Sequence, residues 1–416
     1  MPETRSLSPL PQAAGGGRAT YLNVLSAGEF RAIFLADIVS MLGTVVAAVA
    51  LTVLVYQRTG SPALAASVMA LAFLPYLVGG VLLGATADRL PPRTALTSCD
   101  LLSAALVGAM LIPGMPVAGL LCLLAANGLL APVYQGVRAA LLPEVLGAGP
   151  RYILGRAMMR MVAQSAQVAG YGVGGLLLAI LSPRGALAAD AASFAASAVM
   201  LRFGTRRRGA RAAGTGSMAR DSLAGIRAVS SHRRVRRILL FGWLVPACAV
   251  APEALAAPYA AHIGEPVRAA GFLLMGIPAG TIIADVLAAR LLSTGWQRRI
   301  IVPAGLLVFA PLAGFAASPG LGLAIGLLVV SGLGAAWFAG LDGLLIESAP
   351  PELRNRALAM ASAGLMVTQG AGFALWGVVG QFVPVSVVIP AAALAGALAV
   401  VMLAGRGLTR PRAPAG

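Results

Sequence analysis

Long apolar stretches separated by short polar loops dominate the chain from about residue 30 onward. The first six apolar windows fall at about 30 to 56, 63 to 86, 94 to 113, 116 to 138, 156 to 181 and 185 to 204. After a basic segment, six more fall at about 238 to 261, 269 to 291, 300 to 317, 320 to 346, 358 to 382 and 385 to 404. A helix needs about 20 mostly apolar residues to cross the hydrocarbon core, where unpaired backbone groups find no water. The pattern predicts an all-α integral membrane protein with twelve spans in two six-helix bundles.

The expected domain organisation follows from the same windows. It comprises a cytoplasmic N-terminal tail (1–29), a six-helix bundle (30–204), a basic cytoplasmic linker (205–237), a second six-helix bundle (238–404) and a cytoplasmic C-terminal tail (405–416). The first 29 residues are polar and rich in Gly and Pro, without an apolar core before a cleavage site. We therefore expect no cleaved signal peptide, and the first span serves as the insertion signal.

The distribution of arginine orients the predicted spans. All 31 basic residues are Arg, and the formal net charge is +17. Only Arg58, Arg184 and Arg268 fall in or beside loops that follow odd-numbered spans. Because basic loops stay in the cytoplasm, both termini are expected there. The Arg-rich linker allows two interpretations: a topology signal on a flexible tether, or a segment on anionic lipid headgroups worth about 1 kcal/mol per Arg.

Composition excludes several classes of protein. At 59% hydrophobic and 11% charged, with a mean hydropathy of +0.87, the chain is too apolar for a soluble domain. Aromatic residues make up only 6% and do not interleave with Arg, which argues against nucleic-acid binding. Cys99, Cys122 and Cys248 lie far apart without nearby His, so no metal site or disulfide is indicated. No catalytic constellation and no nucleotide-binding loop occurs in the sequence, so we expect a non-enzymatic protein without a cofactor.

A degenerate repeat relates the two groups of spans at an offset near 200 residues. Gly80 and Arg89 of the first group match Gly280 and Arg290 of the second. Parallel repeats about an axis along the membrane normal build many secondary transporters. The repeat therefore favours a transporter with a midplane cavity between two bundles.

The loop between the second and third spans carries the most specific motif. It reads Gly84-Ala-Thr-Ala-Asp88-Arg89-Leu-Pro-Pro-Arg93. This run resembles the G-x-x-x-D-R-x-x-R signature of the major facilitator superfamily in the expected loop, with Gly84, Asp88 and Arg89 at the signature spacing and Arg93 one residue later than the signature places it. Gly84 would allow close approach of another helix, and Asp88 would complement a positive helix end. The alternative is that Arg89 and Arg93 only determine topology.

The resemblance implies a charge relay that latches the outward-open state. The matching partners of Asp88 are Arg138, at the end of the fourth span, and Glu144 after it. The second repeat has Ala288 where the acid would stand, so the latch is expected to be asymmetric.

Other stretches resemble the macrolide-efflux and enterobactin-exporter-like branch of this superfamily. They are Phe30-Arg31, Thr59-Gly60-Ser61, Asp100-Leu101 and Asp190-Ala-Ala-Ser193-Phe194. Proton/drug antiporters also carry a glycine-rich run in the fifth span, matched here by Gly170, Gly172, Gly174 and Gly175 with Tyr171 in place of a proline. These glycines allow tight helix packing. The resemblance implies export, and the altered run leaves uptake open.

Acids inside the spans are the candidates for chemistry, because an Asp at a helix centre costs about 3 kcal/mol to insert and usually faces a cavity. Asp37, about 10 Å into the first span, is the first candidate for a proton carrier or substrate counter-ion; a structural hydrogen bond is the alternative. Glu253 is the second candidate, because it lies in the proline-rich stretch from Pro246 to Pro258 that disturbs the helix.

The remaining acids have simpler interpretations. Asp100, Asp285 and Asp342 project to the cytoplasmic third, where they can pair with loop arginines such as Arg93, Arg290 or Arg354. Asp190 is interpreted as an outer helix-start or gate residue. A set of polar and aromatic residues is a candidate for contact with a bulky amphipathic substrate; the alternatives are packing between helices and anchoring at the membrane interface. The set is Tyr76, Asn127, Tyr134, Gln135, Gln164, Gln167, Tyr171, Trp243, Trp337, Gln369 and Trp376.

The sequence thus predicts a secondary transporter that works by alternating access. The preferred activity is proton-coupled efflux of a small hydrophobic or amphipathic compound, such as a drug, siderophore or secondary metabolite. Protons or Na⁺, the substrate and membrane lipids are the expected partners, and a bacterial inner membrane is the expected location. Uptake of a small solute and a non-transporting membrane sensor or scaffold are the alternatives.

Overall fold

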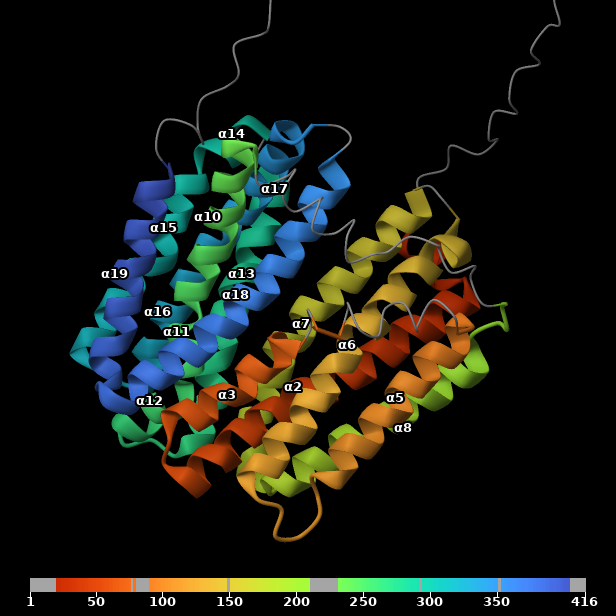
Figure 1. Cartoon of the computed structure of the whole chain (residues 1–416), viewed down its shortest axis with the longest axis horizontal. Coiled ribbons are helices and arrows are strands. Elements are labelled where there is room, and N and C mark those ends of the chain that lie inside the picture. The colour runs from red at the N-terminus through yellow and green to blue at the C-terminus, as the bar shows by residue number, and fades with distance from the viewer. Residues whose placement is uncertain are drawn as a thin grey trace, which may run out of the picture.

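The computed structural model of the chain describes residues 20–75, 78–79, 90–147, 150–209, 231–291, 294–350 and 353–404. These residues form helices joined by short loops, with no strand among them. Figure 1 shows two groups of helices, one coloured red to yellow-green and the other green to blue. The all-α membrane architecture predicted from the apolar windows is confirmed.

The first group holds the helices before the linker. They are α1 (Tyr21–Leu25), α2 (Gly28–Thr59), α3 (Pro62–Phe73), α5 (Pro92–Ala109), α6 (Val117–Leu146), α7 (Pro150–Ile180) and α8 (Pro183–Gly204). We call this group the N-terminal half. Each of the first six predicted windows overlaps one of its helices, although α6 ends eight residues after its window and α7 begins six residues before its window; α1 is a short addition before the first span.

The second group, the C-terminal half, is more broken. It comprises α10 (Arg233–Ala249), α11 (Ala251–Ala254), α12 (Ala256–His262), η1 (Val267–Ala269), α13 (Ala270–Leu291), α14 (Thr294–Arg299), α15 (Ile301–Phe309), η2 (Pro311–Ala317), α16 (Leu321–Leu333), η3 (Gly334–Ala336), α17 (Trp337–Ser348), α18 (Arg354–Phe382) and α19 (Val385–Ala404). The seventh span is interrupted at Val250 and Leu255. Pro252 and Pro258 lack the backbone N–H that a continuous helix needs, which accounts for these breaks.

Seven helices of the described residues are long and apolar enough to cross a membrane by themselves. Short signals in the sequence end and begin them. After α2, Gly60 adopts a left-handed conformation with φ of 62°, and the Ser61 hydroxyl then accepts a hydrogen bond from the Leu64 amide at 3.2 Å. Pro62 follows at the first helical position. A glycine C-cap, a serine N-cap and a proline at the helix start together make this a tight turn between two spans.

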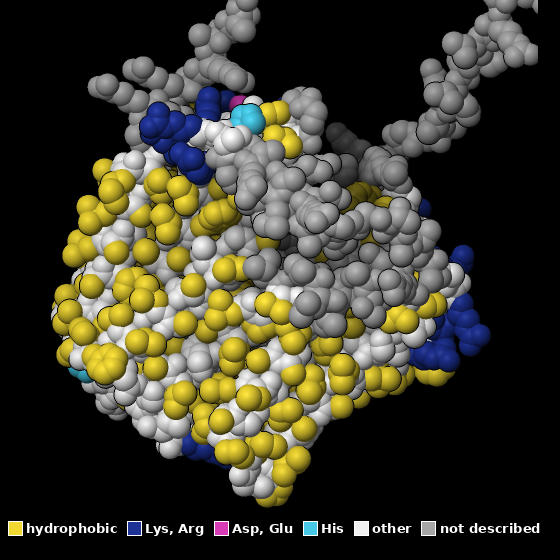
Figure 2. Space-filling model, viewed as in Figure 1, with side chains coloured by type: hydrophobic (Ala, Val, Ile, Leu, Met, Phe, Trp, Pro, Cys, Tyr) yellow, Lys and Arg dark blue, Asp and Glu magenta, His cyan; other side chains and the backbone are white. Residues whose placement is uncertain are grey.

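The surface matches a protein surrounded by lipid. Figure 2 shows hydrophobic side chains over much of the described flank, with dark-blue arginine side chains gathered toward the ends of the bundles. Phe203, Phe382 and Met402 are more than two-thirds exposed. Such exposure is costly in water and costs nothing against acyl chains. We call the end where α5, α7, α10 and α18 begin the Arg-rich end.

Each half contains one equivalent backbone contact between helices. In the N-terminal half, a side chain at Gly79 would overlap the Leu129 carbonyl of α6. In the C-terminal half, a side chain at Gly280 would overlap the Val329 carbonyl of α16. Leu129 and Val329 are related by the repeat offset seen in the sequence, and Gly80 lies outside the described residues. Both contacts require glycine because the helix backbones touch.

The two halves contact each other away from the Arg-rich end. The Ser61 hydroxyl donates a hydrogen bond to Gln381 Oε1 at 2.7 Å, and the Phe73 and Phe373 rings stack with centroids 5.7 Å apart. Gly175 of α7 meets Gly271 of α13 backbone to backbone. We call these contacts the seam. In Figure 1 the halves lie together at α3 and α12 and diverge toward the Arg-rich end.

Candidate functional site

A pocket of about 240 Å³ lies within the N-terminal half. Its lining comes from α2, α5, α6, α7 and α8, and consists of Asp37, Ser40, Met41, Thr44, Cys99, Asp100, Ser103, Asn127, Leu130, Ala131, Tyr134, Gln135, Arg138, Ala163 and Phe194. The α6 members recur at helical spacing, which places them on one face. The pocket is large enough for several water molecules and is partly lined by acids.

An ion pair between Asp37 of α2 and Arg138 of α6 closes one side of the pocket. Asp37 is 7% exposed, and the Arg138 side chain is 15% exposed. Arg138 also donates a hydrogen bond to Gln135 Oε1 at 2.5 Å and lies over the Tyr134 ring, 5.7 Å from its centroid. A buried ion pair is costly to break, because removal of one partner leaves the other charge desolvated.

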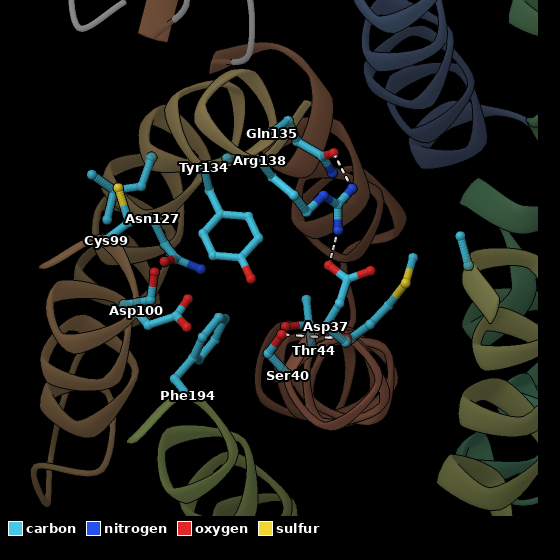
Figure 3. Close-up of a pocket in the computed structure, with 15 residues that line it drawn as sticks. Asp37, Ser40, Thr44, Cys99, Asp100, Asn127, Tyr134, Gln135, Arg138 and Phe194 are labelled. Carbon is cyan, nitrogen blue, oxygen red and sulfur yellow. Dashed lines mark hydrogen bonds and ion pairs between the residues drawn. The ribbon is translucent and has the colours of Figure 1, made fainter. Parts of the chain in front are cut away.

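The opposite side of the pocket is formed around Asp100 of α5. Asp100 is 3% exposed and accepts a hydrogen bond from the Ser197 hydroxyl of α8 at 2.5 Å. Asn127 Oδ1 and the Tyr134 hydroxyl are buried and have no hydrogen-bond partner in the described part of the chain. Figure 3 shows Asp37 and Arg138 on the side toward the C-terminal half, Asp100 and Asn127 on the far side, and Tyr134 between them.

The structure therefore brings two of the predicted acids, Asp37 and Asp100, into one pocket. Among the described residues, Asp100 has a hydrogen bond from Ser197 and no ion pair with a loop arginine such as Arg93. Asp100 lies two turns inside α5 and faces α8, so a serine of that helix is its partner. Ser197 was not anticipated, because its contact depends on the rotation of two helices that the sequence does not reveal.

Asp190 lies two turns inside α8, so it does not start the helix, and its interpretation as an outer gate residue stays a prediction. It is 3% exposed in α8 and accepts hydrogen bonds from Thr44 of α2 and from Ser193, both at 3.4 Å. The neighbouring Gly43 has no room for a side chain against Asp190 and Ser193. Asp190 thus belongs to a close contact between α2 and α8.

The predicted gating motif is described only in part. Gly84, Asp88 and Arg89 lie outside the described residues, and Arg93 Nε is buried without a hydrogen-bond partner among those described. The two expected relay partners have other contacts: Arg138 pairs with Asp37, and Glu144 Oε2 lies 3.4 Å from Arg208 Nε.

Arg208, in the first residues after α8, joins the linker to the N-terminal half. Its guanidinium contacts both carboxylate oxygens of Glu29 at the start of α2, with Nη2 to Oε2 at 2.9 Å. The Arg206 amide donates to the same carboxylate at 3.0 Å. Hydrogen bonding to Glu29 raises the pKa of Arg208 above its usual value. Glu29, Arg206 and Arg208 form what we call the linker clasp, which the sequence did not suggest.

The other predicted acids are dispersed. Glu253 lies in α11, half-buried, within the interrupted seventh span and close enough to Tyr171 of α7 for electrostatic interaction. Asp285 is exposed on α13. The side chain of Asp342 is outside the described part. The described residues contain no group of three or more His, Cys, Asp or Glu side chains suited to a metal.

The glycine run of the fifth span lies between α2 and α13. Gly170 faces Val45 and Gly174 faces Val49, both on α2. Gly172 faces Met275, and Gly175 faces Gly271 of α13 across the seam. The run therefore supplies close contacts both within the N-terminal half and between the halves.

Comparisons with known proteins agree with this architecture. The family model described as "Transmembrane secretion effector", a major facilitator family, matches residues 19–412. No curated protein sequence gives a significant match. Among solved structures, the nucleoside transporter NupG is similar with 19% identity and a TM-score of 0.68, covering 89% of this chain and 98% of that one.

Two further solved structures show the same fold. A peptide transporter in complex with sulfate is 13% identical with a TM-score of 0.68, covering 92% of this chain and 96% of that one. A bacterial homologue of the iron transporter ferroportin, in an inward-facing state, is 15% identical with a TM-score of 0.65, covering 93% and 100%. These identities support the fold alone, whereas the family model spans nearly the whole sequence. The chain belongs to the transmembrane secretion effector family of the major facilitator superfamily.

Proposed function

We propose that this protein is a secondary active exporter that couples efflux of a small hydrophobic or amphipathic compound to proton entry. It works in a bacterial inner membrane with both termini in the cytoplasm. The observation that carries the proposal is the buried Asp37–Arg138 ion pair, which lines a pocket on the side facing the C-terminal half.

The ion pair supplies a reversible charge. Protonation of Asp37 removes one partner and leaves Arg138 desolvated and unbalanced, which is the costly condition for a buried pair. A substrate that approaches Asp37 or Arg138 changes the same balance. Proton and substrate therefore compete for the same ion pair. Such competition is what an antiporter needs in order to exchange a proton for a substrate molecule.

The seam supports the alternating-access part of the proposal. The halves touch at the seam, away from the Arg-rich end. Opening of the protein on the seam side therefore requires the Gly175–Gly271 and Ser61–Gln381 contacts to separate. With arginine on the cytoplasmic side, we interpret the seam as the closure toward the outside. Residues 30–204 and 238–404 would then move as the two bodies that rock about the pocket.

The remaining predicted residues have roles in the same cycle. We place Gly84, Asp88, Arg89 and Arg93 in the cytoplasmic gate, on the resemblance of their motif. Glu253 stands beside the seam and is the second candidate for charge transfer. Export rather than uptake is favoured by the secretion family and by the resemblance to efflux proteins.

The test is ΔpH-driven efflux of hydrophobic antibiotics and siderophores from vesicles that contain the purified protein. Asp37→Asn is expected to abolish proton-coupled efflux, and Asp88→Asn to slow it. Glu253→Gln tests the second candidate. Glu265→Gln, an acid in the loop between α12 and η1, is the matched control and is expected to transport normally.

Three outcomes would contradict the proposal. Unchanged coupling in Asp37→Asn would remove the ion pair from the mechanism. Substrate movement with the proton instead of against it would establish uptake. No proton or substrate flux for any compound in the wild-type protein would favour a sensor or scaffold.

A further inference from the structure

The far side of the pocket forms a chamber whose charge is not balanced. We call the residues Asp100 and Ser103 of α5 with Asn127 and Tyr134 of α6 the inner chamber; all four line the pocket. Asp37, on the other side, is neutralised by Arg138. The partner of Asp100 in the described part of the chain is the neutral Ser197 hydroxyl. The two sides of the pocket therefore differ by one negative charge.

A desolvated carboxylate without a cation is unfavourable. Asp100 is 3% exposed, and one hydroxyl donor offsets only part of the cost of burying an ionised group. Structures resolve this cost by pairing the carboxylate, by binding a cation or by protonating the acid, and the neighbouring oxygens of the chamber favour the cation. None of the ion pairs found among the described residues includes Asp100.

The neighbouring oxygens point to what fills the chamber. Asn127 Oδ1 and the Tyr134 hydroxyl are buried and have no hydrogen-bond partner among the residues that the structure describes. Buried polar atoms are nearly always satisfied, so orphaned ones indicate a water or an ion. Figure 3 shows the Asp100 carboxylate, the Asn127 amide and the Tyr134 hydroxyl around the same space, beside Phe194.

We propose that the inner chamber binds a sodium ion, with Asp100, Asn127, Tyr134 and Ser103 as oxygen ligands. One carboxylate and neutral oxygens match a monovalent hard cation, whereas a divalent ion takes more charged ligands. Nitrogen and sulfur ligands in clusters, which transition metals prefer, are lacking among the described residues. The pocket volume of about 240 Å³ leaves room for waters that complete the coordination shell.

The bound ion has a consequence for transport that rests on the proposed function. It would neutralise Asp100, which lies next to Tyr134. The Arg138 guanidinium lies over the face of the Tyr134 ring. The occupancy of the inner chamber would thus be communicated to the Asp37–Arg138 pair through one side chain. Binding itself does not depend on any transport activity.

Sodium binding can be tested on the purified full-length protein in detergent. Thermal unfolding is measured in NaCl, KCl and choline chloride at constant ionic strength and pH, and ²²Na⁺ binding is measured directly. The wild-type protein is expected to show a saturable rise in Tm with Na⁺ only, because a ligand that binds the folded state stabilises it. Asp100→Asn is expected to abolish both the shift and ²²Na⁺ binding.

Two subtler variants and a control keep the test decisive. Tyr134→Phe and Asn127→Leu each remove one ligand and are expected to weaken Na⁺ binding by about 10-fold or more. If Asp100→Asn does not fold, Tyr134→Phe, which removes a single oxygen, decides the question. Asp190→Asn is the matched control, since Asp190 is equally buried in the same half but does not line the pocket. It is expected to keep the sodium response.

Several results would overturn the sodium site. They are the absence of a sodium-specific shift in wild type, an undiminished shift in Asp100→Asn or in Tyr134→Phe, and stabilisation by acidification alone with no effect of Na⁺ at fixed pH. Efflux that fails in vesicles while ²²Na⁺ binding persists would refute the proposed function and leave the sodium site standing.

Discussion

The seam between α7 and α13 allows a quantitative prediction about alternation. At Gly271, a methyl group would lie 2.7 Å from the Gly175 amide nitrogen and 2.8 Å from the Tyr171 carbonyl oxygen. These are backbone atoms of the other half, so no flexible side chain can move aside. We predict that Gly271→Ala forces the halves apart at the seam and favours the state open on that side.

The magnitude follows from the overlap. Non-bonded heavy atoms sit at about 3.5 Å or more, so the two helices must separate by about 0.8 Å to accept the methyl group. Overpacking of this kind costs about 1–3 kcal/mol. Applied to an equilibrium between two states, this range changes their ratio by about 5- to 150-fold. Alanine is the better helix former by about 1 kcal/mol, but that gain applies to both states.

Cross-linking across the seam measures the effect. Cysteines replace Ser61 and Gln381, whose side chains share a hydrogen bond at 2.7 Å. The native Cys99, Cys122 and Cys248 are replaced by alanine. With a short bifunctional thiol reagent, Gly271→Ala is expected to slow cross-linking, because the rate follows the population of the closed state; the change in ratio of about 5- to 150-fold is the upper limit of this slowing.

Gly322→Ala in α16 is the matched control, because a methyl group there meets nothing within 4 Å. It is expected to cross-link like the parent protein. A cross-linking rate in Gly271→Ala equal to that of Gly322→Ala would refute the backbone contact, and with it the assignment of the seam as the closed gate.

Two further predictions concern charged contacts. Arg138→Leu leaves Asp37 buried without a partner and is expected to destabilise the protein by about 3–5 kcal/mol, measured by thermal unfolding. The double variant Asp37→Leu with Arg138→Leu is expected to recover most of that loss. Equal losses in the single and the double variant would contradict a buried ion pair. Arg208→Gln opens the linker clasp, worth less than about 1 kcal/mol at this exposure, and is expected to speed limited trypsin cleavage of the linker, as high salt does for wild type. Hydrogen bonding to Glu29 raises the pKa of Arg208 in the folded protein. The contribution of Arg208 to stability is therefore complete at any pH below its pKa in the unfolded chain, and it is lost only as the pH rises through its higher pKa in the folded protein. Protection from trypsin that is lost between pH 7 and 9 would contradict this assignment.

The spans could be read from the sequence because apolar length is a local property. The window from 30 to 56 became α2 (Gly28–Thr59), and the window from 94 to 113 became α5 (Pro92–Ala109). The superfamily was also recognisable, since the motif around Asp88 has fixed spacing and a fixed loop. The efflux branch and the substrate stay predictions, because the number of spans is the same whatever compound the protein transports.

The partners of the buried charges could not be read in the same way. Asp37 and Arg138 are 101 residues apart, and Asp100 and Ser197 are 97 apart. Which side chains meet depends on how each helix rotates about its axis. In an apolar span, all faces look alike in the sequence, so the rotation has little signature. The interruption of the seventh span was predictable, because proline acts on its own helix.

The paired contacts of Gly79 with Leu129 and of Gly280 with Val329 affect how such a protein can be inhibited. Within each half, two helices are held at backbone distance, with no room for a side chain between them. The Gly175–Gly271 contact of the seam joins the two halves instead, so in the proposed cycle it is the backbone contact that has to open. A small molecule that wedges inside one bundle would find little motion to block. One that binds at the junction of α7 and α13 would arrest the cycle, so inhibitor screens should be directed at that junction.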